Sequence, residues 1–174
     1  MGRVSQAQAQ ENRKQIVRIA ARLFRERGVA GVSVADVMAE AGLTHGGFYK
    51  HFASKEALVA EAVAQAFAQR ADLLATVPRD AFIAGYLSAA HRDAAGDGCP
   101  SAGFGGDLAR AGQDAGARAE YARGVEMYAD WLDGDLATLS TMVGAIILAR
   151  ATAGTDVSDR ILATARDRLV PRAV

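Results

Sequence analysis

The sequence contains very little cysteine and no long apolar run. Among 174 residues Cys99 is the single cysteine, so no disulfide can form within one chain, and we expect a reducing compartment. The longest nearly uncharged apolar stretch, residues 136–149, is too short and too polar for a membrane span. The N-terminus has no apolar signal core. We therefore predict a cytoplasmic protein with no membrane contact.

The sequence also has no net charge, although its charges are unevenly distributed. Residues 1–58 contain nine Lys and Arg against five Asp and Glu, so this segment is +4 and the remainder is −4. All three lysines lie in the first segment. A basic end on a neutral chain favours a local contact with a polyanion, although an imbalance of this size is also common on solvated helices.

Signatures of the common enzyme classes are missing. The sequence has no Gly-x-Ser-x-Gly elbow, no Gly-Lys-Ser/Thr phosphate loop and no Cys/His spacing typical of a metal site. Two of the three histidines lie within residues 45–51, and His91 has no obvious catalytic partner. We predict that the protein is not an enzyme and uses no metal or cofactor. An enzyme and a non-specific architectural DNA binder are the alternatives, and the acidic, apolar-rich C-terminal part argues against the second.

Hydrophobic periodicity predicts an all-α fold with no strand. After a mobile tail at residues 1–9, a first helix runs over residues 11–27, with an apolar face of Ile16, Ala20, Leu23 and Phe24. The further helices are predicted over residues 33–41, 44–52, 54–75, 80–91, from 100 onward with interruptions at its glycines, 118–132, 136–153 and from a cap at Ser158. We expect an N-terminal three-helix domain over residues 1–58 and a C-terminal helical domain over residues 59–174.

The two short helices over residues 33–41 and 44–52 are typical of a helix-turn-helix. Ser33 can cap the first in a capping box, Gly42 can end it, and Thr44 can cap the second. A helix-turn-helix places its second helix in the DNA major groove with its N-terminal residues toward the base edges. A helical hairpin that binds no DNA is the alternative.

This second helix has only about two turns, so it cannot support itself. Phe48 and Phe52 lie at positions i and i+4 and can anchor it to the neighbouring helices. The polar residues 49–51 lie between these anchors and are available to a partner.

The run over residues 31–58 resembles the DNA-binding domain of the TetR family of repressors. The matching parts are the Ala-Gly-Leu-Thr turn at 41–44, the Phe-Tyr-x-His-Phe core at 48–52 and the Ser-Lys-Glu-x-Leu opening of a helix at 54–58. An Ala-x-x-Leu-Phe pattern before a glycine in the first helix matches too, so the resemblance covers roughly residues 11–60.

The resemblance implies a set of DNA contacts. Tyr49, His51 and Lys55 contact or brace phosphates, while residues 45–47 and Lys50 face the bases. The predicted DNA-binding residues are Ser33, Thr44, His45, Gly46, Gly47, Tyr49, Lys50, His51 and Lys55. Packing roles for His51 and Tyr49 are the alternatives.

The resemblance further implies that the C-terminal part senses a small molecule and forms a homodimer. The protein would bind a palindromic double-stranded operator as a repressor and be released by a small apolar or aromatic effector. Apolar residues of the last two helices give the predicted dimer interface: Leu139, Val143, Ile146, Ile147, Ile161, Leu162 and Leu169. A buried central helix in a monomer is the alternative.

Aromatic and polarizable residues suit an apolar effector cavity, although core packing explains each of them equally well. The candidates are Phe82, Tyr86, Phe104, Met127, Tyr128 and Trp131. We expect the helix over residues 54–75 to connect this cavity to the DNA-binding domain.

Cys99 is a candidate redox site. It precedes Pro100 and so caps a predicted helix, whose N-terminus can stabilise a thiolate. The alternative is a small, buried apolar residue. The run Gly-Cys-Pro at 98–100 also resembles the LmrA/YxaF-like subgroup of the TetR family.

Overall fold

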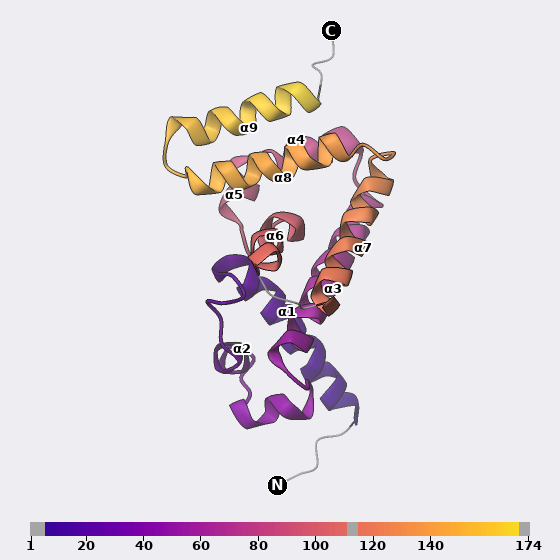
Figure 1. The fold of residues 1–174 in the computed structure, drawn as a ribbon, viewed down its shortest axis with the longest axis vertical. Helices are drawn as coiled ribbons and strands as arrows, with labels where there is room; N and C mark the ends of the chain where they lie inside the picture. The colour runs from indigo at the N-terminus through magenta and orange to yellow at the C-terminus, as the bar shows by residue number, and fades with distance from the viewer. Residues whose placement is uncertain (1–5, 111–114, 171–174) are drawn as a thin grey trace.

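The computed structural model describes residues 6–110 and 115–170, and these parts of the chain contain helices and no strand (Figure 1). The helices are α1 (Gln6–Arg27), α2 (Val34–Glu40), the 3-10 helix η1 (His45–Lys50), α3 (Lys55–Leu74), α4 (Arg79–Tyr86), α5 (Ala89–Asp93), α6 (Pro100–Arg110), α7 (Ala115–Trp131), α8 (Leu136–Ala151) and α9 (Asp156–Leu169). The prediction of an all-α fold is therefore confirmed.

The molecule is elongated, with the N-terminal helices at one end and the last two helices at the other (Figure 1). Helices α1, α2 and η1 form the N-terminal end, and the long helix α3 leads away from it. Helix α7 packs along α3, while α8 and α9 pack together across the far end. Helix α6 lies between the two ends and contacts α1, α3, α7 and α8.

The N-terminal core forms as the periodicity predicts. The four apolar residues of the α1 face are buried, together with Phe48 and Leu58 from the following helices. The capping box at the start of α2 is present, because Ser33 Oγ accepts from the Asp36 N–H and the Asp36 carboxylate accepts from the Ser33 N–H. After α2 the chain turns at Gly42, whose φ of +67° is a conformation that favours glycine.

Several predicted helix boundaries in this region are wrong. Helix α1 begins at Gln6, so residues 6–9 of the predicted mobile tail are helical, and residues 1–5 lie outside the described part of the chain. The second helix of the helix-turn-helix is a 3-10 helix, and Thr44 precedes it without a side-chain cap bond. Arg25 of α1 is buried although it is charged.

The C-terminal part differs from the prediction at three helices. The predicted helix over 80–91 is two helices, because Ser88 Oγ caps a new helix by accepting from the His91 N–H at 3.2 Å. Helix α6 runs through its glycines without interruption. Helix α9 begins at Asp156, and Ser158 lies inside it, buried, with its hydroxyl donating to the Ala149 carbonyl at 2.8 Å.

The glycines of α6 have a packing reason. A Cβ at Gly103 would lie 2.7 Å from Cγ of Arg25, and a Cβ at Gly105 would lie 2.8 Å from the Tyr121 hydroxyl. Small residues at these positions let α6 approach both α1 and α7, and tertiary packing outweighs the low helix propensity of glycine.

One hydrophobic cluster extends through the described residues from Ile16 to Ala165. No single helix in the described ranges is long and apolar enough to cross a membrane, and α7 and α8 meet that test only as a pair bent by 117°. No group of three or more His, Cys, Asp and Glu side chains that could hold a metal ion occurs in those ranges.

Candidate nucleic-acid interface and ligand cavity

The helix η1 has one buried face and one exposed face. Phe48 and Phe52 are buried and stack on each other with ring centroids 5.4 Å apart, which anchors a helix too short to be stable alone. Tyr49 points outward with 67% of its side chain exposed, so a core role for it is wrong. His45 and Lys50 are exposed as well, and the His45 and Tyr49 rings contact edge to face at 6.4 Å.

Arg13 of α1 holds the end of this element in place. Its guanidinium donates to the His51 carbonyl, pairs with Glu61 of α3 and lies 4.2 Å from the centroid of the Phe52 ring. The sequence predicts no specific role for Arg13. Its partners lie 38 and 48 residues away, so no local pattern reveals this role.

The turn between α1 and α2 is fixed at Val29 from two sides. The Val29 N–H donates to Asp107 of α6 at 2.8 Å, and Nζ of Lys55 at the start of α3 donates to the Val29 carbonyl at 2.6 Å. Nζ of Lys55 also lies 5.9 Å from the centroid of the Phe24 ring. Lys55 therefore has a bracing contact within the protein, and two further N–H donors remain on its ammonium.

The remaining predicted DNA-binding residues lie on or beside the same end of the molecule. Ser33, Thr44 and Gly46 are exposed, although Ser33 Oγ is engaged in its capping box. Gly47 and His51 are half-buried. The predicted DNA-binding residues thus belong to α2, η1, the start of α3 and their flanking positions at the N-terminal end, and their contacts with DNA stay a prediction.

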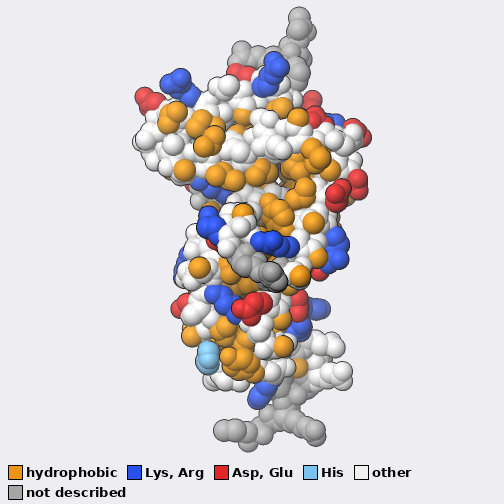
Figure 2. Space-filling view, in the orientation of Figure 1, with side chains coloured by type: hydrophobic (Ala, Val, Ile, Leu, Met, Phe, Trp, Pro, Cys, Tyr) orange, Lys and Arg blue, Asp and Glu red, His pale blue; other side chains and the backbone are white. Residues whose placement is uncertain are grey.

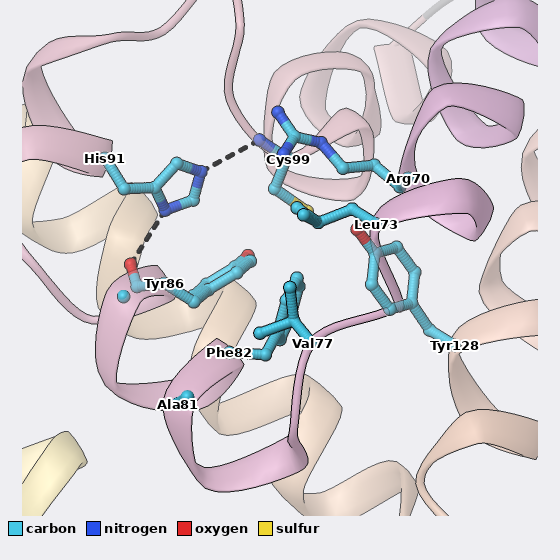
Figure 3. Close-up of a pocket in the computed structure, with 10 residues that line it drawn as sticks. Arg70, Leu73, Val77, Ala81, Phe82, Tyr86, His91, Cys99 and Tyr128 are labelled. Atoms are coloured by element: carbon cyan, nitrogen blue, oxygen red, sulfur yellow. Dashed lines mark hydrogen bonds between the residues drawn. The ribbon is translucent and has the colours of Figure 1, made fainter. Parts of the chain in front are cut away.

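A cavity of about 260 Å³ lies between α3, α4 and α7, beside the segment 91–99 (Figure 3). Its apolar wall is formed by Leu73, Val77, Ala81, Phe82 and Gly85. The polar lining residues are Arg70, Tyr86, His91, Cys99 and Tyr128.

Three of the six predicted cavity residues line this space, namely Phe82, Tyr86 and Tyr128. The other three do not. Phe104 is fully buried in the core, Met127 is half-buried outside the lining, and Trp131 packs edge to face on Phe82 at 5.0 Å. The sequence shows which helices carry aromatic side chains. It does not show which face of each helix lines a cavity.

His91 lines the cavity as a neutral ring with both nitrogens occupied. Its Nδ1 lies 2.7 Å from the Tyr86 carbonyl, and its Nε2 accepts from the Cys99 N–H at 3.0 Å (Figure 3). These two partners require the proton to be on Nδ1. Burial lowers the pKa of His91 to about 4, so the ring is uncharged near neutral pH. Its role is to join α4 to the start of α6.

Three arginines hold the segment 91–98. Arg25 donates to the Gly96 carbonyl at 2.6 Å, Arg70 donates to the Gly98 carbonyl at 3.3 Å, and Arg150 donates to the carbonyls of His91 and Arg92 at 3.0 Å each. Burial, and secondly the positive charge of Arg70, lower the pKa of Arg25 to about 10. The cluster therefore concentrates positive charge behind the cavity.

Cys99 is only 1% exposed. It precedes α6 as predicted, but its side chain lies among the cavity-lining residues and not at the surface. This burial favours the interpretation of Cys99 as a packed residue over a redox site.

The predicted dimer residues divide into two groups. Leu139, Ile146 and Leu162 are buried within the chain's own core, so they are not available to a partner and that part of the prediction is wrong. Val143, Ile161 and Leu169 are partly buried, and Ile147 is exposed.

A groove of about 530 Å³ runs between α8 and α9. Gly144 and Ala145 line it with Leu148, Val157 and Ile161. Figure 2 shows apolar side chains gathered over these two helices. Leu148, in the last turn of α8, is 56% exposed and adds to the apolar surface beside the groove.

The comparisons with known proteins divide between a short sequence match and a match of the whole fold. The family described as "Bacterial regulatory proteins, tetR family" matches residues 16–62. The HTH-type transcriptional regulator TtgR of Pseudomonas putida is 46% identical over 59 residues, which are 34% of this chain and 28% of that protein. The HTH-type transcriptional repressor KstR2 of Mycobacterium tuberculosis is 41% identical over 61 residues, 35% of this chain and 30% of that protein.

These sequence matches thus span less than a third of the length of either relative. A TetR-family transcriptional regulator from Agrobacterium tumefaciens has a similar structure over the whole chain. It has a TM-score of 0.70 at 21% identity and covers 92% of this chain and 98% of its own. At this identity the likeness shows the fold. Residues 16–62 therefore match the model of the tetR family of bacterial regulatory proteins, and the described helices have the all-helical fold seen in a TetR-family regulator.

Proposed function

We propose that this protein is a ligand-responsive transcriptional repressor and not an enzyme. It would bind a palindromic operator as a homodimer and leave it when a small molecule occupies the cavity. The observation that carries the proposal is the exposed face of η1, where His45, Tyr49 and Lys50 project from a rigidly anchored element within the family's DNA-binding domain. The names of its relatives support regulation of transcription.

Contacts of this surface with DNA would follow the usual division between backbone and base contacts. We propose that Tyr49, His51 and Lys55 contact or brace phosphates. Residues 45–47 and Lys50 would face the bases, with readout by His45 and Lys50 because the two glycines carry no side chain.

The division into a DNA-binding domain over residues 1–58 and an effector and dimerisation domain over residues 59–174 remains part of this proposal. Membership of the LmrA/YxaF-like subgroup is also part of this proposal, and it rests on the Gly-Cys-Pro run at 98–100.

Dimerisation would use the outer face of α8 and α9. Leu148, Val157 and Ile161 lie around the groove between these helices, and Ile147 is exposed beside it. Gly144 lets a partner helix approach closely, since no atom lies within 4 Å of a Cβ placed there. Two helices from each chain would bury this surface in a four-helix bundle.

Coupling between the cavity and the DNA-binding surface has a direct physical route through Val29. Its N–H is held by Asp107 of α6, whose first turn adjoins Cys99 in the cavity lining. Its carbonyl is held by Lys55 of α3, which carries Arg70 and Leu73 in the same lining. A ligand that shifts α3 or α6 would therefore move the turn before α2. Such a ligand lowers the affinity for the operator only if it binds the shifted conformation more tightly than the DNA-binding one.

Operator binding is tested by selecting DNA sites from random sequence and footprinting the result. We expect an inverted repeat whose half-sites lie about one helical turn apart. His45→Ala should relax the preference at one position of each half-site, at a cost of about 1–3 kcal/mol. Arg166→Ala, an exposed cation on α9, is the matched control and should change neither affinity nor preference. An unchanged site preference for His45→Ala would refute the base contact.

Dimerisation is tested independently by sedimentation. Leu148→Glu places a charge on the exposed groove and should yield monomers that remain folded. Leu136→Glu is the control, because Leu136 is equally exposed at the start of α8 but does not line the groove. A wild-type protein that sediments as a monomer while footprinting a single half-site would refute the dimer.

A further inference from the structure

Two hydroxyl groups in the cavity have no hydrogen-bond partner. Tyr86 is 5% exposed and Tyr128 is 1% exposed, and within the described part of the chain neither hydroxyl meets an acceptor in hydrogen-bond geometry. Figure 3 shows both phenol oxygens pointing toward the sulfur of Cys99 at one end of the cavity. A buried hydroxyl without a partner costs free energy, and native proteins rarely leave one in that state.

The two hydroxyls are available as donors. Burial, with a smaller contribution from the neighbouring Cys99 thiol, raises the pKa of both phenols, so both stay protonated at any physiological pH. The neighbouring groups are poor acceptors for these hydroxyls. The Cys99 thiol accepts only weakly, and both ring nitrogens of His91 are already engaged.

Positive charge lies beside these donors without a matching acid. Arg70 lines the cavity and forms no ion pair with the residues that the structure describes, and its guanidinium donates to the Gly98 backbone carbonyl. Arg25 and Arg150 hold the adjacent segment in the same way. No Asp or Glu among the described residues lines the cavity, and Asp97, the acid that acts most strongly on Arg25, is exposed.

The other end of the cavity is apolar. Leu73, Val77 and Phe82 form a wall for a ring or a short chain. At about 260 Å³ the cavity is slightly below the usual range of ligand sites, roughly 300–1,000 Å³, so it suits a compact molecule.

From this arrangement we infer that the effector is a small organic carboxylate with an aromatic or short aliphatic body. Its carboxylate accepts from the hydroxyls of Tyr86 and Tyr128 and faces Arg70, while its body packs on the apolar wall. Hydrogen bonds to a charged acceptor are stronger than neutral ones, so the carboxylate sets the specificity. This inference rests on the proposed effector role of the cavity and adds a carboxylate to the small apolar or aromatic effector expected from the sequence.

The test measures binding to the full chain by calorimetry without DNA. The probes are benzoate and phenylacetate, each paired with its primary amide, which has the same shape and no charge. We expect each acid to bind at least about tenfold more tightly than its amide, equivalent to about 1.4 kcal/mol. Arg70→Gln should reduce this difference in affinity between each acid and its amide.

Tyrosine-to-phenylalanine variants give a second, independent readout. Tyr86→Phe and Tyr128→Phe should each weaken acid binding about tenfold. They should also raise the melting temperature of the free protein by about 2–4 °C, because an unsatisfied hydroxyl is removed. Tyr121→Phe is the matched control. Its hydroxyl donates to the Ser101 carbonyl at 2.8 Å and it does not line the cavity, so this variant should melt lower and bind the acids normally.

The inference is overturned if the amides bind as tightly as the acids, if no acid binds at millimolar concentration, or if neither phenylalanine variant weakens acid binding. A separate mobility shift on operator DNA distinguishes these failures from failure of the proposed function. An acid that binds as described but leaves operator affinity unchanged refutes effector control and leaves the ligand class standing.

Discussion

Replacing Gly124 by alanine should destabilise the protein by overpacking the contact between α7 and α3. Gly124 is buried at the point where the Phe67 ring of α3 lies against the α7 backbone. A Cβ there would fall far inside contact distance of three carbons of that ring, so the ring or the helix must move. Among the described helices α3 and α7 share the most extensive contact, and residues of both helices line the cavity.

Two opposing effects decide the magnitude. In a helix interior alanine is favoured over glycine by about 0.8–1.0 kcal/mol. Overpacking a well-filled core costs about 1–3 kcal/mol, and the severity of this overlap places Gly124→Ala at the upper end. The net loss is about 1–2 kcal/mol. For a protein of this size it lowers the melting temperature by about 2–8 °C.

The assay is urea unfolding followed by circular dichroism, with two companion variants. Gly106→Ala is the matched control, because a Cβ there meets only the Arg110 guanidinium nitrogens at 3.4 Å, and it should stabilise the protein by up to about 1 kcal/mol. In a Phe67→Leu background Gly124→Ala should reduce the free energy of unfolding by less than in the wild type. The difference is the coupling energy between the two positions. If Gly124→Ala stabilises as Gly106→Ala does, the close packing inferred at this contact is wrong.

Three further predictions follow from the buried groups. His91 has a pKa of about 4 in the folded protein against about 6.5 when unfolded, so the unfolded state binds more protons between those values. Stability should fall from pH 6.5 to 4 by at most about 1.4 kcal/mol per unit, and urea titrations of His91→Gln should show a shallower fall. Lys55→Met should reduce stability by about 1 kcal/mol, because the Val29 carbonyl loses its partner. If Lys55→Met also reduces by about one the slope of the logarithm of the operator binding constant against the logarithm of salt concentration, the phosphate contact is supported. An unchanged slope limits Lys55 to bracing the Val29 turn. Cys99 should resist a soluble maleimide until the protein is denatured, and rapid labelling of the folded protein would revive the redox hypothesis.

Local sequence determined the main features of the helix-turn-helix. The capping box at Ser33, the turn at Gly42 and the buried pair Phe48 and Phe52 are set by residues within four positions of one another. Hydrophobic periodicity and capping act over the same short range, so one sequence suffices to predict them. Two predicted boundaries in the C-terminal part failed, because Ser88 caps a new helix whereas Ser158 lies inside α9 and donates to the Ala149 carbonyl.

Tertiary structure alone decided which residues surround the cavity and which large apolar side chains of α8 are exposed. His91 joins α4 to α6, and Arg70 reaches the segment after α5, through contacts that no periodicity encodes. Leu139 and Ile146 looked like an exposed stripe but are buried, whereas Leu148 is exposed. An apolar helix such as α8 has no polar face to orient it, so its rotation is set by the helices that pack against it.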